Sequence, residues 1–209
     1  MTTIFEFDKF IFTWINIDWS NPIFDLMMPI LSHLADRNIT WLWIILIGFI
    51  SAMHFARSGK IKESKFKRLP IIRAFVFFCL FSAVIYGVNA GAYVGLKHLF
   101  NRSRPFVEQN AILRVSPATI LKLQNDGSFP SGHACNAFMI AALFADRVRR
   151  KRITFYGLAS LIALSRIYLG VHYPSDVVIG SCLGLTVTWL MLSFRALRNR
   201  ITSEHSFLL

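Results

Sequence analysis

Residues 74–96 read AFVFFCLFSAVIYGVNAGAYVGL, which is 23 consecutive positions without Asp, Glu, Lys or Arg. A helix needs about 20 predominantly apolar residues to cross a hydrocarbon core of roughly 30 Å. Three other stretches of at least 18 residues lack those charges as well: residues 38–56, 127–145 and 177–194. Two weaker apolar stretches complete the set, residues 22–35 and 153–165. The sequence therefore predicts an all-α protein, a bundle of six transmembrane helices with the first one short or oblique.

The composition indicates that lipid is the surrounding medium. Of the 209 residues, 55% are hydrophobic and only 16% are charged, whereas a soluble domain carries about 25% charged residues. The chain has no internal repeat and no low-complexity tract, so residues 1–209 are predicted to form a single domain. The three cysteines fall within predicted spans, which favours buried thiols over disulfides.

Basic residues are concentrated in three segments that follow predicted spans. The net charge is +12, and 15 of the 23 lysines and arginines fall in these segments. They are Arg57, Lys60, Lys62, Lys65, Lys67, Arg68, Arg73, Arg147, Arg149, Arg150, Lys151, Arg152, Arg195, Arg198 and Arg200. If six spans alternate, all three segments lie on one side, which the positive-inside rule makes cytoplasmic, and both termini lie there too. A nucleic-acid-binding protein would instead need these residues on one folded face, so no nucleic-acid partner is expected.

The N-terminal residues 4–19 are rich in Phe and Trp and carry a few charges. This pattern predicts a helix that lies along the membrane interface. Glu6 and Asp8 come where a signal peptide would have a basic segment and an apolar core, so no signal peptide is expected.

Residues 98–130 form the one long polar connection, on the side opposite the basic segments. Long loops in compact proteins are usually functional. Three groups of unusual residues meet this outer face: KHLFNRSRP at 97–105, PSGH at 130–133 and SRIYLGVHYPSD at 165–176. The functional site is therefore expected at this end of the bundle.

Three cations in these groups point to a common anion. Lys97, Arg104 and Arg166 lie on the side that the positive-inside rule depletes of positive charge. Each alone is explained by anchoring at a helix end, but three together indicate a bound phosphate. Ser131 is a good N-cap, and Gly132 lets a ligand approach the free N–H groups of a helix start.

Two of the six histidines are candidates for chemistry. His133 and His172 each lie near a predicted helix start on the outer face, and Asp176 follows His172 by four residues. A carboxylate there can accept a proton from one imidazole nitrogen and leave the other nucleophilic. The alternative is that Asp176 caps helix amides beside a bystander histidine. The remaining histidines, His33, His54, His98 and His205, are expected to be structural.

A metal centre is disfavoured by the balance of charges. Two-metal phosphatases need several carboxylate or imidazole ligands. The outer acids are few: Asp36, Glu108, Asp126 and Asp176. The outer cations are more numerous: Arg37, Lys97, Arg102, Arg104, Arg114, Lys122 and Arg166. We therefore predict direct clamping of phosphoryl oxygens by cations, with no metal and no cofactor.

Together the three groups resemble the signature of the type-2 phosphatidic acid phosphatases, whose helical core is shared with the vanadium haloperoxidases. The family pattern is Lys, six residues, Arg-Pro; then Pro-Ser-Gly-His; then Ser-Arg, five residues, His, three residues, Asp. Residues 97–105, 130–133 and 165–176 match every specified position. The resemblance covers a motif-bearing core at about residues 74–194, and the short stretch 106–129 is similar to that of small bacterial membrane-bound members.

The resemblance implies a role for each matching residue. His172 would attack phosphorus to form a phosphohistidine, and Asp176 would orient and stabilise it. His133 would protonate the leaving oxygen and then activate water. The phosphoryl oxygens would be bound by Lys97, Arg104, Ser131, the Gly132 amide and Arg166.

The implied activity is that of a multi-pass lipid phosphatase of the plasma (bacterial inner) membrane, with its site facing the periplasm or exterior. Polyprenyl diphosphate, phosphatidylglycerol phosphate and phosphatidic acid are the leading substrates, with a lipid A phosphatase as an alternative. A phosphotransferase would use the same phosphohistidine with a lipid acceptor. A lipid-phosphate carrier would not need His133, His172 and Asp176 together. The expected partners are the lipid phosphate and the bilayer, and the oligomeric state stays open.

Overall fold

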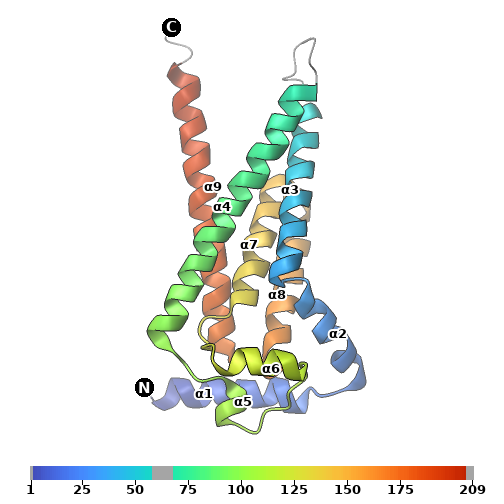
Figure 1. Cartoon of the computed structure of the whole chain (residues 1–209), viewed down its shortest axis with the longest axis vertical. Helices are drawn as coiled ribbons and strands as arrows, with labels where there is room; N and C mark the ends of the chain where they lie inside the picture. The colour runs from blue at the N-terminus through green and yellow to red at the C-terminus, as the bar shows by residue number, and fades with distance from the viewer. Residues whose placement is uncertain (1, 58–67, 206–209) are drawn as a thin grey trace.

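The computed structural model describes residues 2–57 and 68–205, and within these residues the regular structure is helical, with no strand (Figure 1). In chain order the helices are α1 (Thr2–Thr13), the π-helix η1 (Trp14–Asp18), α2 (Pro22–His33), α3 (Arg37–Arg57), α4 (Arg68–Phe100), α5 (Pro105–Glu108), α6 (Pro117–Gln124), α7 (Gly132–Arg147), the 3₁₀ helix η2 (Arg149–Lys151), α8 (Arg152–Tyr168) and α9 (Pro174–His205). The predicted all-α class is confirmed. The basic residues Lys60, Lys62, Lys65 and Lys67 lie outside the described residues.

Helices α3, α4, α7, α8 and α9 run along the long axis of the bundle (Figure 1). Within the described parts of the chain, three stretches are long and apolar enough to cross a membrane: Arg37–Arg57, Leu69–Glu108 and Pro174–Leu197. By contrast, α2 has 12 residues and is about 18 Å long, shorter than the hydrocarbon core. Helix α1 and the C-terminal part of α9 lie at opposite ends (Figure 1). The predicted six crossings and the shared cytoplasmic side of the termini are therefore not confirmed.

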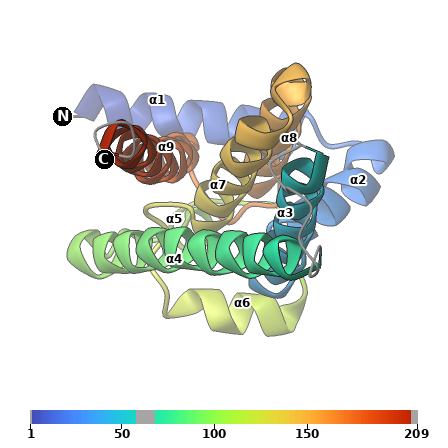
Figure 2. The same ribbon diagram turned by 90° about the horizontal axis from the view of Figure 1, so that it is seen from above.

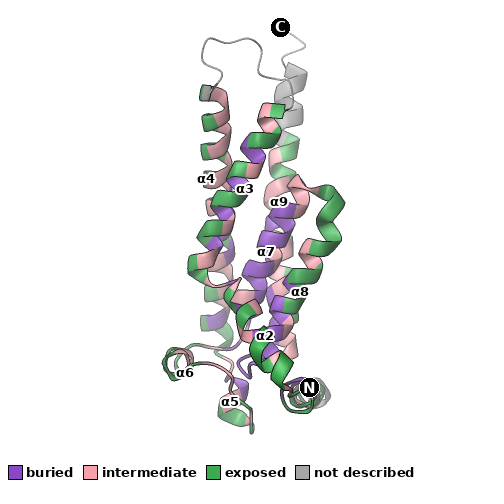
Figure 3. Cartoon of the chain, turned by 90° about the vertical axis from the view of Figure 1, so that its right-hand side faces the viewer, coloured by how far each residue is buried: buried purple, intermediate pink, exposed green. Residues whose placement is uncertain are grey.

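Helix α7 forms the buried centre of the bundle (Figure 3). It packs closely on α9, where Gly180 and Gly184 face it, and a Cβ at either glycine would collide with the carbonyl oxygen of Ser131 or Cys135. Small residues four positions apart let two helices approach in this way. The Ser131 amide also donates a hydrogen bond to the Asp176 carbonyl oxygen (2.9 Å). This contact fixes the first turn of α7 against the first turn of α9.

Helix α1 lies across the end of the bundle where α5 and α6 also lie (Figures 1 and 2). Asp8, Phe12 and Ile15 follow the i, i+4, i+7 spacing of one helical face and are buried. Phe7 and Phe10 are exposed. A helix that lies crosswise with apolar side chains outward has the geometry expected at a membrane interface.

Candidate active site

The three groups of residues singled out in the sequence meet at the end of the bundle where α5 and α6 lie. They come from different elements: Lys97 from the last turn of α4, Arg104 from the residue before α5, Ser131, Gly132 and His133 from the start of α7, Arg166 from the last turn of α8, His172 from the connection after α8, and Asp176 from the first turn of α9. The three cations, His172 and Asp176 are all buried. Charged side chains are rarely buried unless they are paired, so this cluster is a polar site built into an apolar bundle.

The ring of His172 has a defined orientation. Nη1 of Arg104 lies 3.4 Å from Nε2 of His172 and 2.9 Å from the Val171 carbonyl oxygen. A guanidinium can only donate hydrogen bonds, so Nε2 accepts and carries no proton. The proton of the neutral ring is then on Nδ1, which lies 3.6 Å from Oδ2 of Asp176. Nε2 is therefore unprotonated and directs its lone pair at the cations, where a bound phosphate would lie.

Asp176 contacts both the histidine and the helix start. Its Oδ2 accepts a hydrogen bond from the Tyr173 amide (2.9 Å), which is the helix-capping role foreseen as the alternative. At 3.6 Å the contact with Nδ1 of His172 is too long for a hydrogen bond, and Nδ1 has no hydrogen-bond partner among the described residues. Catalytic hydrogen bonds are often long without substrate and shorten in the complex. Asp176 is thus placed for both roles.

Burial lowers the pKa of His172 well below its ordinary value, and the positive charges of Arg104, Arg166 and Lys97 lower it further. The ring is therefore neutral near pH 7. The same charges that would attract a phosphate thus keep the nucleophile unprotonated.

Lys97 and Arg104 share one acidic partner, Asp126. Nζ of Lys97 donates to Oδ2 of Asp126 (2.7 Å) and to the Gly127 carbonyl oxygen (2.6 Å). Nη2 of Arg104 donates to the same Oδ2 (3.1 Å), and its Nε donates to the Asp126 carbonyl oxygen (2.8 Å). The loop before α7 therefore holds both cations beside His172. Asp126 was identified in the sequence only as an outer acid.

Arg166 is held from the other side by α2. Its Nη1 donates to the hydroxyl of Ser32, while its Nε is buried with no hydrogen-bond partner in the part of the chain that the structure describes. A buried donor without a partner is costly, and a bound phosphoryl oxygen would satisfy it.

His133 is paired with an acid that the sequence did not assign to it. Its Nε2 donates to Oδ1 of Asp36 (2.8 Å), and Nδ1 of His33 donates to Oδ2 of the same carboxylate (2.7 Å). The hydrogen bond from His133 is the main cause that lowers the pKa of Asp36 to about 2. The spacing of His33 and Asp36 was a local signal, but nothing local linked Asp36 to a residue 97 positions away.

Ser131 and Gly132 form the turn that starts α7. The Ser131 hydroxyl caps the helix by accepting from the Ala134 amide (3.5 Å), as its N-cap assignment predicted. A Cβ on Gly132 would lie 3.2 Å from Cε2 of Tyr93, so a larger residue would require this ring to shift slightly. Binding of phosphate at this turn stays a prediction.

Two further residues of the site were missed by the sequence reasoning. Arg102 donates to Oδ1 of Asp176 (2.7 Å) and to Oδ2 of Asp8 (2.7 Å). Arg102 lies in the unspecified gap of the first motif, and Asp8 lies in the N-terminal helix. The one available signal was Asp8 itself, a charge on the inner face of an amphipathic helix.

No group of three or more His, Cys, Asp or Glu side chains could hold a metal ion within residues 2–57 and 68–205. The acids near the site are instead paired with arginine, lysine or histidine. Independence from metal stays a prediction.

A helical bundle with membrane-crossing helices, a neutral buried histidine and a cluster of cations defines a membrane enzyme of phosphoryl transfer. The family model described as PAP2 superfamily matches residues 69–200, and the chain belongs to that superfamily. The resemblance drawn from the three motifs is thereby confirmed, and the protein is a phosphate-hydrolysing enzyme.

Curated relatives are lipid phosphatases by name. The decaprenylphosphoryl-5-phosphoribose phosphatase of Mycobacterium tuberculosis is 31% identical over 163 residues, which cover 75% of this chain and 72% of the relative. The lipid A 4'-phosphatase of Porphyromonas gingivalis is 27% identical over 191 residues, 90% of this chain and 72% of the relative.

Two solved structures share the fold. A transmembrane PAP2-type phosphatidylglycerolphosphate phosphatase from Bacillus subtilis superposes with a TM-score of 0.66 at 23% identity, over 94% of this chain and 88% of that one. LpxE of Aquifex aeolicus gives a TM-score of 0.64 at 22% identity, over 88% of this chain and 93% of that one.

Proposed function

We propose that the protein hydrolyses the phosphomonoester or diphosphate group of a membrane lipid through a phosphohistidine formed on His172. The observation that carries the proposal is the orientation of this ring. Nε2 faces Arg104 at 3.4 Å and Nδ1 faces Asp176 at 3.6 Å. A neutral imidazole held between a cation and a carboxylate is arranged to attack a phosphorus atom whose oxygens are bound by the cation.

In the first step, Nε2 of His172 attacks phosphorus and the bond from phosphorus to the leaving oxygen breaks. Burial and the charges of Arg166 and Arg104 lower the pKa of His133 to about 4 in the free protein. A bound phosphate offsets those charges, and the doubly protonated ring then transfers its Nδ1 proton to that oxygen. Arg104, Arg166 and Lys97 bind the non-bridging oxygens and neutralise their charge, which is the main contribution expected of a protein in phosphoryl transfer. Asp176 stabilises the positive charge that forms on the imidazole.

In the second step, water attacks the phosphohistidine and the N–P bond breaks. His133 is neutral after the first step, so it accepts the proton of the attacking water. Inorganic phosphate leaves, and His172 returns to its neutral form. Because Asp36 occupies Nε2 of His133 (2.8 Å), Nδ1 is the nitrogen that exchanges this proton.

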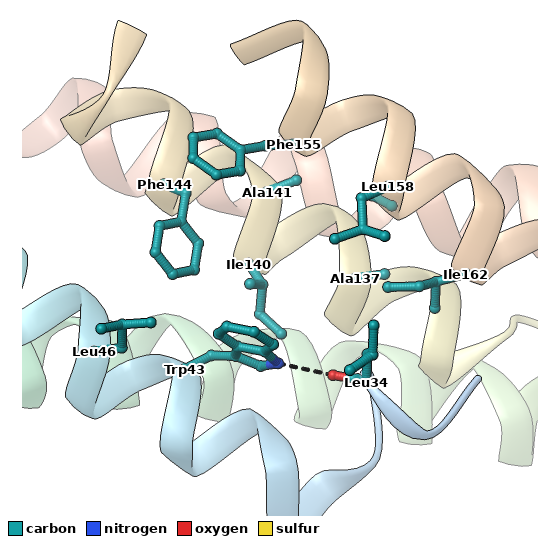
Figure 4. Close-up of a pocket in the computed structure, with 11 residues that line it drawn as sticks. Leu34, Trp43, Leu46, Ala137, Ile140, Ala141, Phe144, Phe155, Leu158 and Ile162 are labelled. Atoms are coloured by element: carbon teal, nitrogen blue, oxygen red, sulfur yellow. Dashed lines mark hydrogen bonds between the residues drawn. The ribbon is translucent and has the colours of Figure 1, made fainter. Parts of the chain in front are cut away.

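An apolar groove that starts beside the site supports a lipid substrate (Figure 4). It has a volume of about 260 Å³ and is lined by side chains of α3, α7 and α8. Ala137 of the groove lies one turn after His133, and Ile162 lies one turn before Arg166. The lining residues 137–144 of α7 extend for about 10 Å. A hydrocarbon tail in this groove would leave its phosphate near the two site residues.

The groove can be tested by narrowing its edge. Leu158 lines the groove, whereas Leu161 is an exposed leucine of the same helix that does not. Leu158→Trp should raise the KM for a long-chain lipid phosphate roughly tenfold, since about two methylene groups lose burial worth about 0.8 kcal/mol each. Hydrolysis of p-nitrophenyl phosphate, which has no tail, should not change. Leu161→Trp is the matched control. An equal effect of both variants would show that the lipid tail does not bind in the groove.

The leading substrates are polyprenyl diphosphate, phosphatidylglycerol phosphate and phosphatidic acid, with lipid A phosphate as the second candidate. The names of the Mycobacterium tuberculosis and Porphyromonas gingivalis relatives support a polyprenyl-linked phosphate and lipid A respectively. We propose that the site lies at the outer leaflet of the plasma membrane, because Arg57 and Arg147 end helices that run away from it and Arg195 lies in the C-terminal half of α9.

The direct test is phosphate release from a panel of purified lipid phosphates, with His172→Ala as the control. We expect activity on at least one lipid phosphate and retention of that activity in EDTA. Appearance of the phosphate on an added lipid alcohol instead of in water would make the protein a phosphotransferase. Loss of activity in EDTA that Mg²⁺ or Zn²⁺ restores would contradict the metal-free mechanism.

A further inference from the structure

Arg102 bridges two buried carboxylates that are far apart in the sequence. Its Nη1 donates to Oδ1 of Asp176 and its Nη2 to Oδ2 of Asp8, both at 2.7 Å. Asp8 is 5% exposed and Asp176 is fully buried. The guanidinium also stacks on the ring of Tyr173, 4.1 Å from its centroid. A planar guanidinium bound at both ends and along one face has a fixed position.

Ser175 links the same side chains in the first turn of α9. Its amide donates to Oδ1 of Asp8 (2.9 Å), and its hydroxyl donates to Oδ2 of Asp8 (2.6 Å) and accepts from Arg102 (2.7 Å). Free amides at a helix start favour a carboxylate. Asp8 of α1 therefore caps the turn of α9 that carries Asp176.

The orientation of the Asp176 carboxylate depends on bonds at both of its oxygens. The terminal torsion of an aspartate is soft. Oδ2 is shared between the Tyr173 amide (2.9 Å) and Nδ1 of His172 (3.6 Å), and Oδ1 is held by Arg102 (2.7 Å). Release of Oδ1 would let the carboxylate rotate and move Oδ2 away from the histidine.

We infer that Asp8 and Arg102 are positioning residues for the nucleophile, which they serve by holding Asp176 in the orientation that faces His172. The inference rests on the proposed function, since it concerns the step that His172 carries out. Neither residue is a specified position of the three motifs, and Asp8 lies outside the residues 69–200 that the family model matches. Helix α1, which lies across the end of the bundle, thereby contributes a residue to the active site.

The test is the isosteric variant Asp8→Asn in the full-length protein in lipid vesicles. Its kcat should fall about tenfold, because the variant weakens the charge-assisted hydrogen bond between residue 8 and Arg102, the residue that holds Asp176. The loss should be equal for a lipid phosphate and for p-nitrophenyl phosphate, since the nucleophile and not the leaving group is affected, and KM should not change. Asp8→Glu should recover part of the loss. Glu6→Gln, which alters an exposed acid two residues away on the same helix, is the matched control and should keep the wild-type kcat.

A double-mutant cycle separates positioning from a simple attachment of α1. In the Asp176→Asn background, Asp8→Asn should cost less than about twofold, because its effect passes through Asp176. A tenfold loss in both backgrounds would assign Asp8 a structural role only and overturn the inference, as would a wild-type kcat for Asp8→Asn. If Asp8→Asn does not fold, Arg102→Lys, which keeps the charge and loses the planar bridge, is put through the same cycle.

His172→Ala distinguishes this inference from the proposed function. If His172→Ala is inactive while Asp8→Asn has wild-type kcat, the positioning role alone is wrong. If His172→Ala retains activity, the phosphohistidine mechanism itself is wrong.

Discussion

Two histidine–aspartate pairs lie at the same end of the bundle, and their surroundings differ. The side chains of His172 and Asp176 are 3% and 0% exposed, whereas those of His133 and Asp36 are 29% and 39% exposed. The buried pair is 3.6 Å apart, too far for a hydrogen bond, and the partly exposed pair is joined by a hydrogen bond of 2.8 Å. A nucleophile benefits from a dry site where it stays neutral, while a group that exchanges protons with water must be reachable by water.

The two acids in these pairs are also held differently. Asp176 is held by Arg102, which is held in turn by Asp8. Asp36 is held by two histidines, and its pKa is lowered to about 2, chiefly by the hydrogen bond from His133. Asp36 is therefore ionised near neutral pH, where it accepts the hydrogen bond of His133. The difference suggests a division of labour, with His172 as the nucleophile and His133 as the acid and base.

The largest expected effect comes from removing the nucleophile. His172→Ala should lower phosphate release from every substrate by about 10⁴-fold or more, as loss of a covalent nucleophile does. No phosphoenzyme should be trapped when this variant is quenched in alkali after mixing with labelled substrate. A trapped phosphoenzyme in His172→Ala would show that the buried pair is not the nucleophilic one.

A smaller and more selective effect is expected at the partly exposed pair of His133 and Asp36. Asp36→Asn should lower the rate on a lipid monophosphate about tenfold, because a misplaced general acid loses part of its usual contribution of roughly 10²–10⁴-fold. The rate of the first turnover with p-nitrophenyl phosphate should change less than about twofold, since its leaving group needs no proton. His33→Asn, which removes only the second partner of Asp36, is the control. An equal loss on both substrates would mean that Asp36 acts on the nucleophile.

The sequence could predict the part of the site whose residues occur at a fixed spacing within short motifs. Three short motifs identified six residues that the structure brings together: Lys97, Arg104, Arg166, His133, His172 and Asp176. Asp36 and Asp8 could not be assigned in this way, because their hydrogen bonds to His133 and Ser175 span 97 and 167 positions. Such pairs depend on how α1 and α2 pack on the bundle, which no local pattern specifies.

Prediction of the fold was limited in the same way, because only local features of the sequence could be used. Apolar stretches identified the long helices correctly, because hydrophobic length is a property of the stretch itself. The N-terminal region was harder, since an apolar segment of 12 residues such as α2 (Pro22–His33) can cross obliquely or pack at one end. Asp25 and Pro29 in that helix were signs of the second arrangement.

The smallest effect is a shift of the pH profile. Burial and nearby cations lower the pKa of His172, and an imidazole is nucleophilic only when it is neutral, above its own pKa. The acid limb of kcat/KM should therefore lie below the ordinary histidine value of about 6.5. Lys97→Gln removes one of these cations and should move the acid limb to higher pH, whereas Glu6→Gln should not move it. A wild-type limb at or above pH 6.5 would contradict a buried, neutral nucleophile.

The division of labour between the two pairs is tested most directly by His133→Ala on two substrates. An alkoxide leaving group needs a proton in the transition state, an assistance worth roughly 10²–10⁴-fold, whereas a nitrophenolate leaves almost unaided. In the first turnover the variant should therefore lose at least about 10²-fold more activity on a lipid monophosphate than on p-nitrophenyl phosphate. With p-nitrophenyl phosphate a phosphohistidine at His172 should accumulate, because its hydrolysis needs the base. A ratio of losses near one, or a phosphoenzyme that maps to His133, would mean that the roles of the two histidines are reversed.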